Sequence, residues 1–118
     1  MDFKNNMPIY KQIVRKIKED IALGVYSPGQ QFPSVRDLAS EMKVNPNTIQ
    51  RSIAELVGED YLFSKRGVGN FVTQDQASLN ELKEDLVKGH IKTFTDSMQR
   101  LGFSKDEIIS KMTEVLKW

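Results

Sequence analysis

The sequence predicts a mainly α-helical fold with one small β-hairpin, followed by a helical tail. Apolar residues recur at helical spacing from residue 9 to residue 57 and again after residue 78. Between these stretches, residues 61–73 hold two runs of β-forming residues around a glycine-containing tip, which is typical of a hairpin. A polar connector follows at residues 73–77. We therefore expect two domains, residues 1–75 and residues 76–118.

The first helix is predicted over residues 8–23. Pro8 suits the first helical position because the amide it lacks would have no partner there, and Gly24 suits the helix end. Tyr10 has two interpretations, a contact to phosphate or an amphipathic core residue, and we favour the core role. The apolar face consists of Ile9, Ile13, Val14, Ile17, Ile21 and Leu23.

A turn and an extended segment are predicted after this helix. Pro28 and Gly29 match the two central positions of a type II turn, where only glycine adopts positive φ without steric cost. Pro33 keeps Phe32 out of the helical region. This stretch allows a very short strand.

Two short helices joined by a tight turn are predicted over residues 32–56, and the rest of the first domain is arranged around them. Ser34 is a candidate N-cap of the first, with Asp37 placed to reach back to it. Asn45 and Pro46 start the second as N-cap and first helical residue, because Asn accepts from the free amides and Pro has none to leave unpaired.

The start of the second short helix carries short hydrogen-bonding side chains, although a helix that only faces water needs no more than Glu and Lys. The cluster is Asn47, Thr48, Gln50, Arg51 and Ser52. In a helix-turn-helix, the second helix enters the major groove with its N-terminal residues at the base edges, and these residue types suit base and phosphate contacts. The alternative is an ordinary helical hairpin whose polar start faces water.

Lys65 and Arg66 lie at the tip of the predicted hairpin, next to Gly67. On an edge hairpin, such residues can serve only to discourage aggregation. Directly after a helix-turn-helix, a basic tip can instead reach the phosphate backbone or the adjacent minor groove. We favour the second interpretation, which makes the first domain a winged helix-turn-helix.

Overall charge does not favour a nucleic-acid partner. The formal net charge is +1; residues 1–75 hold ten Lys/Arg against nine Asp/Glu, and residues 76–118 hold seven of each. A positive surface must therefore be local, and a few phosphate contacts suffice for salt-dependent affinity. The chain has no cysteine, no apolar run that could span a bilayer and no signal-like start, so we expect a cytoplasmic protein without membrane contact.

The joint spacing of several motifs carries a resemblance to a known family. The motifs are residues 8–10, Gly24, residues 28–29, 33–39 and 44–49, Arg51, Leu56 and residues 66–72. Together they resemble the winged-helix DNA-binding domain of the GntR family of bacterial transcription regulators. The opening Pro-Ile-Tyr, the Asn-Pro-Asn-Thr turn and the short tail are most similar to the YtrA-like subgroup.

The resemblance implies a sequence-specific DNA-binding regulator, and we expect a repressor. The sequence departs from the family pattern twice: many members carry a glycine one or two residues later in the corner at residues 58–60, and Asn70 stands where Thr is commoner. The residues expected to contact double-stranded DNA are Arg36, Asn45, Asn47, Thr48, Gln50, Arg51, Lys65, Arg66 and Gly67.

Two further helices are predicted in the tail, opened by capping boxes at residues 78–81 and 104–107. Two such helices cannot bury both apolar stripes on each other, so we expect a homodimer, which places two recognition helices about one DNA turn (~34 Å) apart on a palindrome. The subgroup resemblance implies the same. The alternative is a tail folded back on its own winged helix. The expected interface residues are Leu82, Leu86, Ile91, Phe94, Met98, Leu101, Ile108 and Met112.

Two other functions compete with DNA binding. A winged-helix module for protein contacts would carry an apolar or acidic recognition face, unlike this one. An enzyme has little support, because we find no nucleophile paired with a base, no phosphate-cradling glycine loop and no metal-ligand cluster. His90, the single histidine, fits packing or surface better than a metal site, so we expect no cofactor and no metal. No residue identifies an effector, although one could bind between dimer helices.

Overall fold

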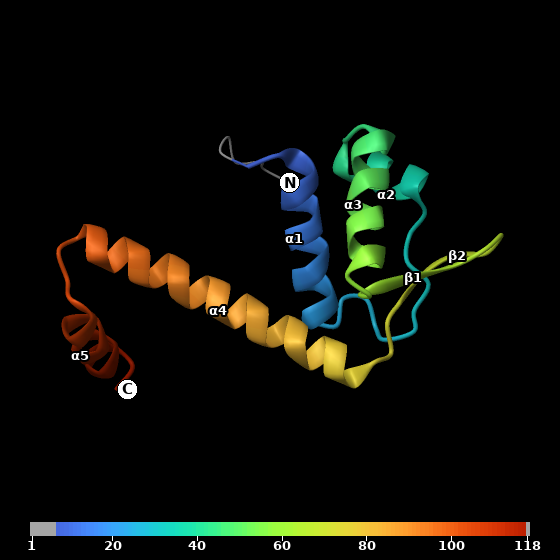
Figure 1. The fold of residues 1–118 in the computed structure, drawn as a ribbon. Helices are drawn as coiled ribbons and strands as arrows, with labels where there is room; N and C mark the ends of the chain where they lie inside the picture. Colours follow the sequence, from blue (N-terminus) through green and yellow to red (C-terminus); the bar gives the residue numbers. More distant parts are fainter. Residues whose placement is uncertain (1–6, 118) are drawn as a thin grey trace. The chain divides into compact units, whose positions relative to one another are not determined.

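The computed structural model describes residues 7–117 of the chain. These residues form helices and one two-stranded antiparallel sheet (Figure 1), which confirms the predicted mainly α fold with a small hairpin. By its internal contacts the chain divides into two compact units, Met1–Lys83 and Glu84–Trp118. The elements in order are α1 (Ile9–Ala22), α2 (Val35–Met42), α3 (Pro46–Gly58), β1 (Leu62–Lys65), β2 (Gly69–Val72), α4 (Gln76–Arg100) and α5 (Lys105–Val115).

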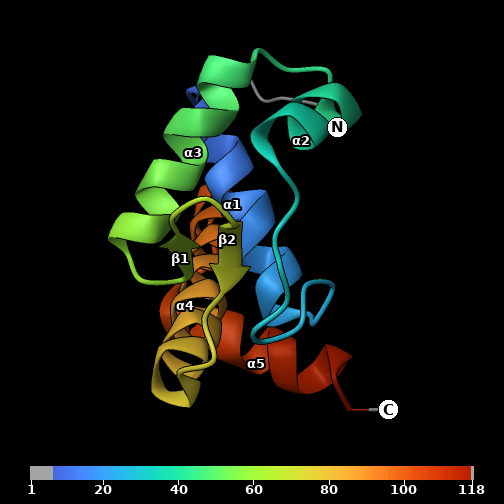
Figure 2. The same ribbon diagram turned by 90° about the vertical axis from the view of Figure 1, so that its right-hand side faces the viewer.

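The first unit is built on the packing of α1 and α2 against α3. Figure 2 shows α2, α3 and the hairpin in front of α1. Burying a single Leu or Ile side chain contributes about 1.5–3 kcal/mol, so this core fixes α3 by its apolar side and leaves the other side exposed. The fully buried apolar side chains of the unit include Ile13, Ile17, Leu38, Ile49, Ile53, Leu56, Leu62 and Val72.

The segment between α1 and α2 turns and then runs beside the hairpin. Gly29 has a φ of +80°, and the Gln30 N–H donates to the Ser27 carbonyl at 3.0 Å, as the predicted type II turn requires. Gln31 then forms an isolated antiparallel bridge with Phe71 of β2. The segment thus forms a single bridge, not a strand of its own, along the edge of β2 that does not pair with β1.

Side-chain caps set the starts of α2 and α3 as predicted. Ser34 Oγ accepts the Asp37 N–H at 3.1 Å, and Asn45 Oδ1 accepts the Asn47 N–H at 2.8 Å. Between the two helices, Lys43 turns the chain in a left-handed conformation with a φ of 57°. These local bonds set where the exposed start of α3 begins.

β1 and β2 form the predicted hairpin, with Leu62 opposite Val72. The corner that leads into β1 turns at Asp60, whose φ is 65°. Glycine adopts this left-handed conformation without steric cost, but the sequence has its glycine two residues earlier, at Gly58. The corner therefore turns at Asp60, in a backbone conformation that is strained for a residue with a side chain.

α4 begins earlier than predicted. The expected capping box at residues 78–81 does not form the helix start, which lies at Gln76. Asp75 caps the helix instead: its carboxylate accepts the Ala77 N–H at 3.3 Å and the Ser78 hydroxyl at 2.7 Å. Ser78 is therefore a donor to the cap rather than the cap itself.

The second unit consists of the later part of α4 together with α5. Leu79 and Leu82 are buried and belong to the first unit, so the division between the compact units falls inside α4. The domain boundary expected between residues 75 and 76 stays a prediction. Ser104 and Glu107 form the predicted capping box of α5, and the Ser104 backbone amide lowers the pKa of Glu107. Among residues 7–117, no helix has the length and apolarity needed to cross a membrane.

Candidate nucleic-acid interface

The start of α3 presents the first part of the candidate interface. Asn47, Gln50 and Arg51 are exposed, and Thr48 is half-buried. The side-chain oxygen of Asn45, Oδ1, caps the helix, which leaves the two N–H donors of the side-chain amide for other partners. The cluster combines amide, hydroxyl and guanidinium groups, which are the side-chain groups that contact base edges and phosphates.

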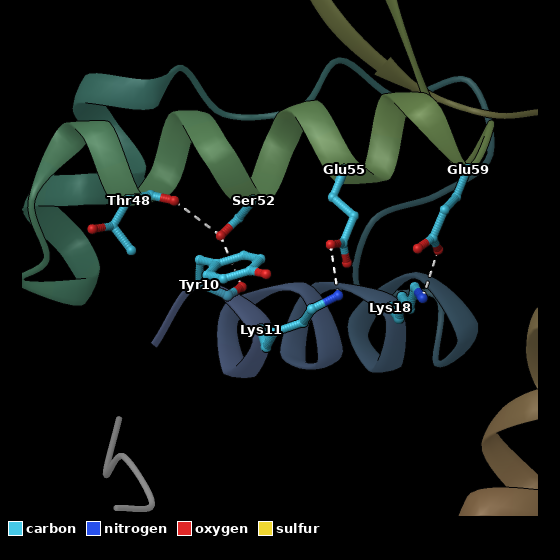
Figure 3. Close-up of polar contacts among 7 residues, drawn as sticks. All are labelled: Tyr10, Lys11, Lys18, Thr48, Ser52, Glu55 and Glu59. Carbon is cyan, nitrogen blue, oxygen red and sulfur yellow. Dashed lines mark hydrogen bonds and ion pairs between the residues drawn. The ribbon is translucent and has the colours of Figure 1, made fainter. Parts of the chain in front are cut away.

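Ser52 does not belong to this exposed cluster, and its predicted place there is wrong. Its side chain has no exposed surface, and its hydroxyl lies 3.0 Å from the carbonyl oxygens of both Tyr10 and Thr48 (Figure 3). At this point of the helical turn the side chain faces α1, which packs along that side of α3. Ser52 therefore fixes the contact between α1 and α3.

Two ion pairs join α1 to the carboxylates at the end of α3. Lys11 Nζ lies 2.8 Å from Glu55 Oε1, and Lys18 Nζ lies 2.6 Å from Glu59 Oε2 (Figure 3). The hydrogen bond to Glu55 raises the pKa of Lys11. Such exposed pairs add little stability. They do neutralise these two carboxylates, so that neither opposes an approaching phosphate as an unpaired charge.

The guanidinium of Arg51 is stacked on an aromatic ring. Its Cζ lies 3.7 Å from the ring centroid of Tyr10, and both residues line a shallow pocket together with Ile9, Asn47 and Thr48. Tyr10 is half-buried, as expected for an amphipathic core residue, and its ring also contacts Arg51. No spacing rule links a residue of α1 to one of α3, and the sequence pattern therefore missed this contact.

The hairpin is the second part of the candidate interface and is called the wing below. Lys65 Nζ lies 4.8 Å from the ring centroid of Phe71, which stacks on Phe63 with 5.6 Å between centroids. Arg66 is exposed at the tip, and Gly67 beside it has a φ of +78°. The tip thus presents two cations, one of them held against aromatic rings.

Two side-chain hydrogen bonds brace the wing. Gln31 Nε2 donates to the Val68 carbonyl at 3.1 Å, which ties the tip to the segment before α2. The Ser64 hydroxyl donates to Asn70 Oδ1 at 2.5 Å across the two strands. Asn70, one of the two departures from the family pattern, therefore supports the wing from within.

The predicted DNA-contacting residues come from three neighbouring elements of the first unit. α2, which carries the exposed Arg36, lies with α3 and the wing in front of α1 (Figure 2). Neither Thr48 nor Arg66 is sealed in the interior, since Thr48 is half-buried and Arg66 is exposed. The contact of each residue with DNA stays a prediction.

The second unit leaves most of its predicted interface residues accessible. Two predicted interface residues, Leu82 of the first unit and Ile108 of the second, are 1% and 4% exposed in the single chain, so they offer no surface to a second copy. Leu86 and Met98 are half-buried. The exposed members of the predicted set are Ile91, Phe94, Leu101 and Met112.

An open groove of about 510 Å³ lies between α4 and α5 within the second unit. It is called the apolar groove below, and its lining residues are His90, Ile91, Phe94, Met98, Lys111, Met112, Val115 and Leu116. Among residues 7–117, no group of three or more His, Cys, Asp or Glu side chains is placed to hold a metal ion.

Comparison with protein families identifies the first unit. Residues 9–72 match the family described as "Bacterial regulatory proteins, gntR family". The chain belongs to the GntR family. Two relatives from Bacillus subtilis (strain 168) are similar to this GntR-family protein over most of both chains. The "Uncharacterized HTH-type transcriptional regulator YhcF" is 36% identical over 107 residues, 91% of this chain and 88% of the relative. The "HTH-type transcriptional repressor YtrA" is 29% identical over 116 residues, 98% and 89% respectively, in line with the predicted YtrA-like subgroup.

Solved structures share the fold of this GntR-family protein. A GntR family transcriptional regulator from Listeria monocytogenes superposes with a TM-score of 0.83 at 38% identity, covering 95% of this chain and 98% of that one. The DNA-binding domain of AraR in complex with operator ORX1 gives a TM-score of 0.57 at 30% identity, covering 61% of this chain and 93% of that one. The winged helix with a helical C-terminal region is therefore an arrangement found in the family.

Proposed function

We propose that this GntR-family protein is a transcriptional repressor that binds a palindromic operator as a homodimer in the cytoplasm. One observation carries the proposal: a single small unit combines an exposed polar helix start with a basic wing tip. The similar AraR domain is in complex with operator DNA, and the relative YtrA is described as a repressor.

The two parts of the interface suit different parts of a duplex. Asn47, Gln50 and Arg51 offer the amide and guanidinium groups that pair with adenine and guanine edges in the major groove. Arg66 suits the phosphate backbone or the minor groove, as Arg36 suits phosphate. Because the formal net charge is only +1, affinity has to come from these few contacts, and it should fall as salt rises.

We assign the exposed apolar residues of the second unit to self-association. Ile91 and Leu101 are 58% and 73% exposed. Ile91 also lines the apolar groove together with Phe94 and Met112, and a contiguous apolar surface marks an interaction site. A second copy that covers it also joins two DNA-binding units, and binding of the second half-site then becomes intramolecular.

The competing function, a protein-interaction module without specific DNA binding, fits the surface less well. Such a module would present an apolar or acidic face on α3. The exposed start of α3 instead presents Asn47, Gln50 and Arg51, and the carboxylates of Glu55 and Glu59 are paired with lysines of α1.

Selection of bound fragments from random DNA with the full-length protein tests the proposal. We expect enrichment of an inverted repeat whose half-sites lie about one helical turn (~34 Å) apart. Enrichment of a lone half-site would reject the dimer and keep DNA binding. A folded protein that enriches no sequence would reject the proposed function.

A further inference from the structure

Tyr10 makes a contact to which the proposed function assigns no role. Its ring carries the Arg51 guanidinium at 3.7 Å, and within residues 7–117 no carboxylate forms an ion pair with Arg51. We propose that Tyr10 is a positioning residue for DNA binding, whose ring holds the Arg51 guanidinium in the orientation that meets the duplex. This inference rests on the proposed function and extends it to a residue of α1.

Stacking is a favourable way to hold an arginine that has to bind something else. A ring held against the face of a guanidinium leaves the N–H donors in the guanidinium plane free for another partner. An ion pair would occupy those donors, and DNA would first have to displace the carboxylate. A stacked side chain also has fewer rotamers to lose on binding, so it is preorganised for a bidentate contact.

The backbone on both sides of the stack is anchored. Ser52, the neighbour of Arg51 on α3, is fully buried with its hydroxyl 3.0 Å from the Tyr10 carbonyl. Lys11, the neighbour of Tyr10 on α1, pairs with Glu55 at 2.8 Å. Figure 3 shows both contacts crossing between the two helices. The ring therefore keeps its place under Arg51 as long as α1 is docked on α3.

The stack also places Arg51 next to other predicted DNA contacts. Tyr10 and Arg51 line the same shallow pocket as Asn47 and Thr48. A guanidinium released from the ring would leave this wall of the pocket. The ring thus affects the shape of the recognition surface without needing a hydrogen bond to DNA.

Substitutions at Tyr10 separate the ring from the hydroxyl. Tyr10→Phe keeps an aromatic face for the guanidinium, whereas Tyr10→Leu keeps only apolar bulk. On the operator selected with the parent protein, we expect Tyr10→Phe to bind like the parent and Tyr10→Leu to bind about three- to five-fold more weakly, the range of an exposed cation–π contact. A Tyr10→Phe variant as weak as Tyr10→Leu would overturn the inference.

A double-mutant cycle with Arg51→Ala distinguishes positioning from general damage to the fold. If Tyr10 acts through Arg51, then Tyr10→Leu causes no further loss of operator affinity once Arg51 is alanine. An equal loss in both backgrounds would show that Tyr10 acts by another route and would reject the positioning role.

Nuclear magnetic resonance of the DNA-free protein gives a readout that is independent of the proposed function. The ring current of Tyr10 should shift the Arg51 Nε–H proton upfield in the parent and in Tyr10→Phe, and Tyr10→Leu should lose this shift. A protein with the shift but no selectable operator would retain the stack and lose the proposed function. A protein that binds its operator but shows no shift would lose the positioning role alone.

Discussion

The two units of the chain differ in how much of their apolar surface they bury. In the first, Leu38 and Ile53 are at most 2% exposed, whereas in the second Leu101 and Val115 are at least 70% exposed. Both units use helices with apolar residues at helical spacing. The difference teaches that such spacing predicts a helix and its apolar face, but not whether the same chain covers that face.

The largest effect should come from a charge placed in the apolar groove. Ile91→Glu should turn dimers into monomers in sedimentation and lower operator affinity by about 100-fold or more, because linking two binding sites gains about 10²–10⁴ in affinity. Ile109→Glu is the matched control, since Ile109 is 60% exposed, against 58% for Ile91, and does not line the groove. Dimers that survive Ile91→Glu would remove the groove from the interface.

Truncation of a leucine to alanine should destabilise the first unit much more than the second. Leu38→Ala should lower the free energy of unfolding of the first unit by about 2–5 kcal/mol, because a fully buried side chain leaves a cavity. Leu101→Ala, in a monomer made with Ile91→Glu, should change the free energy of unfolding of the second unit by less than about 0.5 kcal/mol. Urea unfolding measures both. Equal losses would mean that Leu101 is covered within its own chain in solution.

Arg51→Ala should weaken specific DNA binding by about 10- to 100-fold, because one bidentate contact to a base contributes about 1–3 kcal/mol of discrimination. Arg15→Ala is the control, since Arg15 lies on α1 and its guanidinium is 3.6 Å from Glu19. Titration of operator and scrambled DNA at several salt concentrations measures both effects. Parent-like binding by Arg51→Ala would remove Arg51 from the interface.

Asp60→Gly should stabilise the first unit by about 0.5–1 kcal/mol. The φ of 65° at Asp60 costs a side chain strain that glycine avoids, although glycine loses more backbone entropy on folding. Glu41→Gly tests the opposite case: this residue is inside α2, and glycine there should cost about 1 kcal/mol. Thermal unfolding should move in opposite directions for the two variants. A loss with Asp60→Gly would mean that the aspartate side chain supports the corner.

The smallest effect should be an acid-induced loosening of α5. The Ser104 amide lowers the pKa of Glu107 below its ordinary value of 4.5, so this cap stabilises α5 fully above that value and is lost as pH falls through the lower, folded-state pKa. Amide exchange across α5 should therefore speed up in acid. In Glu107→Gln that acid dependence should disappear, and an unchanged dependence would point to another carboxylate.

Local rules account for much of the first unit. The caps at Ser34 and Asn45 and the turn at Gly29 each depend on residues within a few positions, and the structure has them as predicted. The face of α3 toward α1 was harder to predict. Ser52 is one polar residue in a polar run, and only the docking of α1 shows that it is buried.

Two nearby residues are candidate N-caps of α4, and only one of them caps the helix. Residues 75 and 78 can both cap a helix, and residues 78–81 fit the capping-box pattern. The backbone decides between them, because the Asp75 N–H is held by Thr73 Oγ1 at 3.1 Å directly after the wing. Chain direction at the end of β2, which no motif encodes, therefore sets the helix start.

The wing depends on a partner that is distant in the sequence. β2 pairs with β1 through a short tip, but it also bridges to Gln31, and its Val72 carbonyl accepts the Gly29 N–H at 2.9 Å. A two-stranded hairpin is marginal by itself, and the loop back to Gln31 closes at lower entropic cost once α2 and α3 have folded. The wing should therefore become ordered late in folding, and a peptide of residues 61–73 alone should not keep its shape.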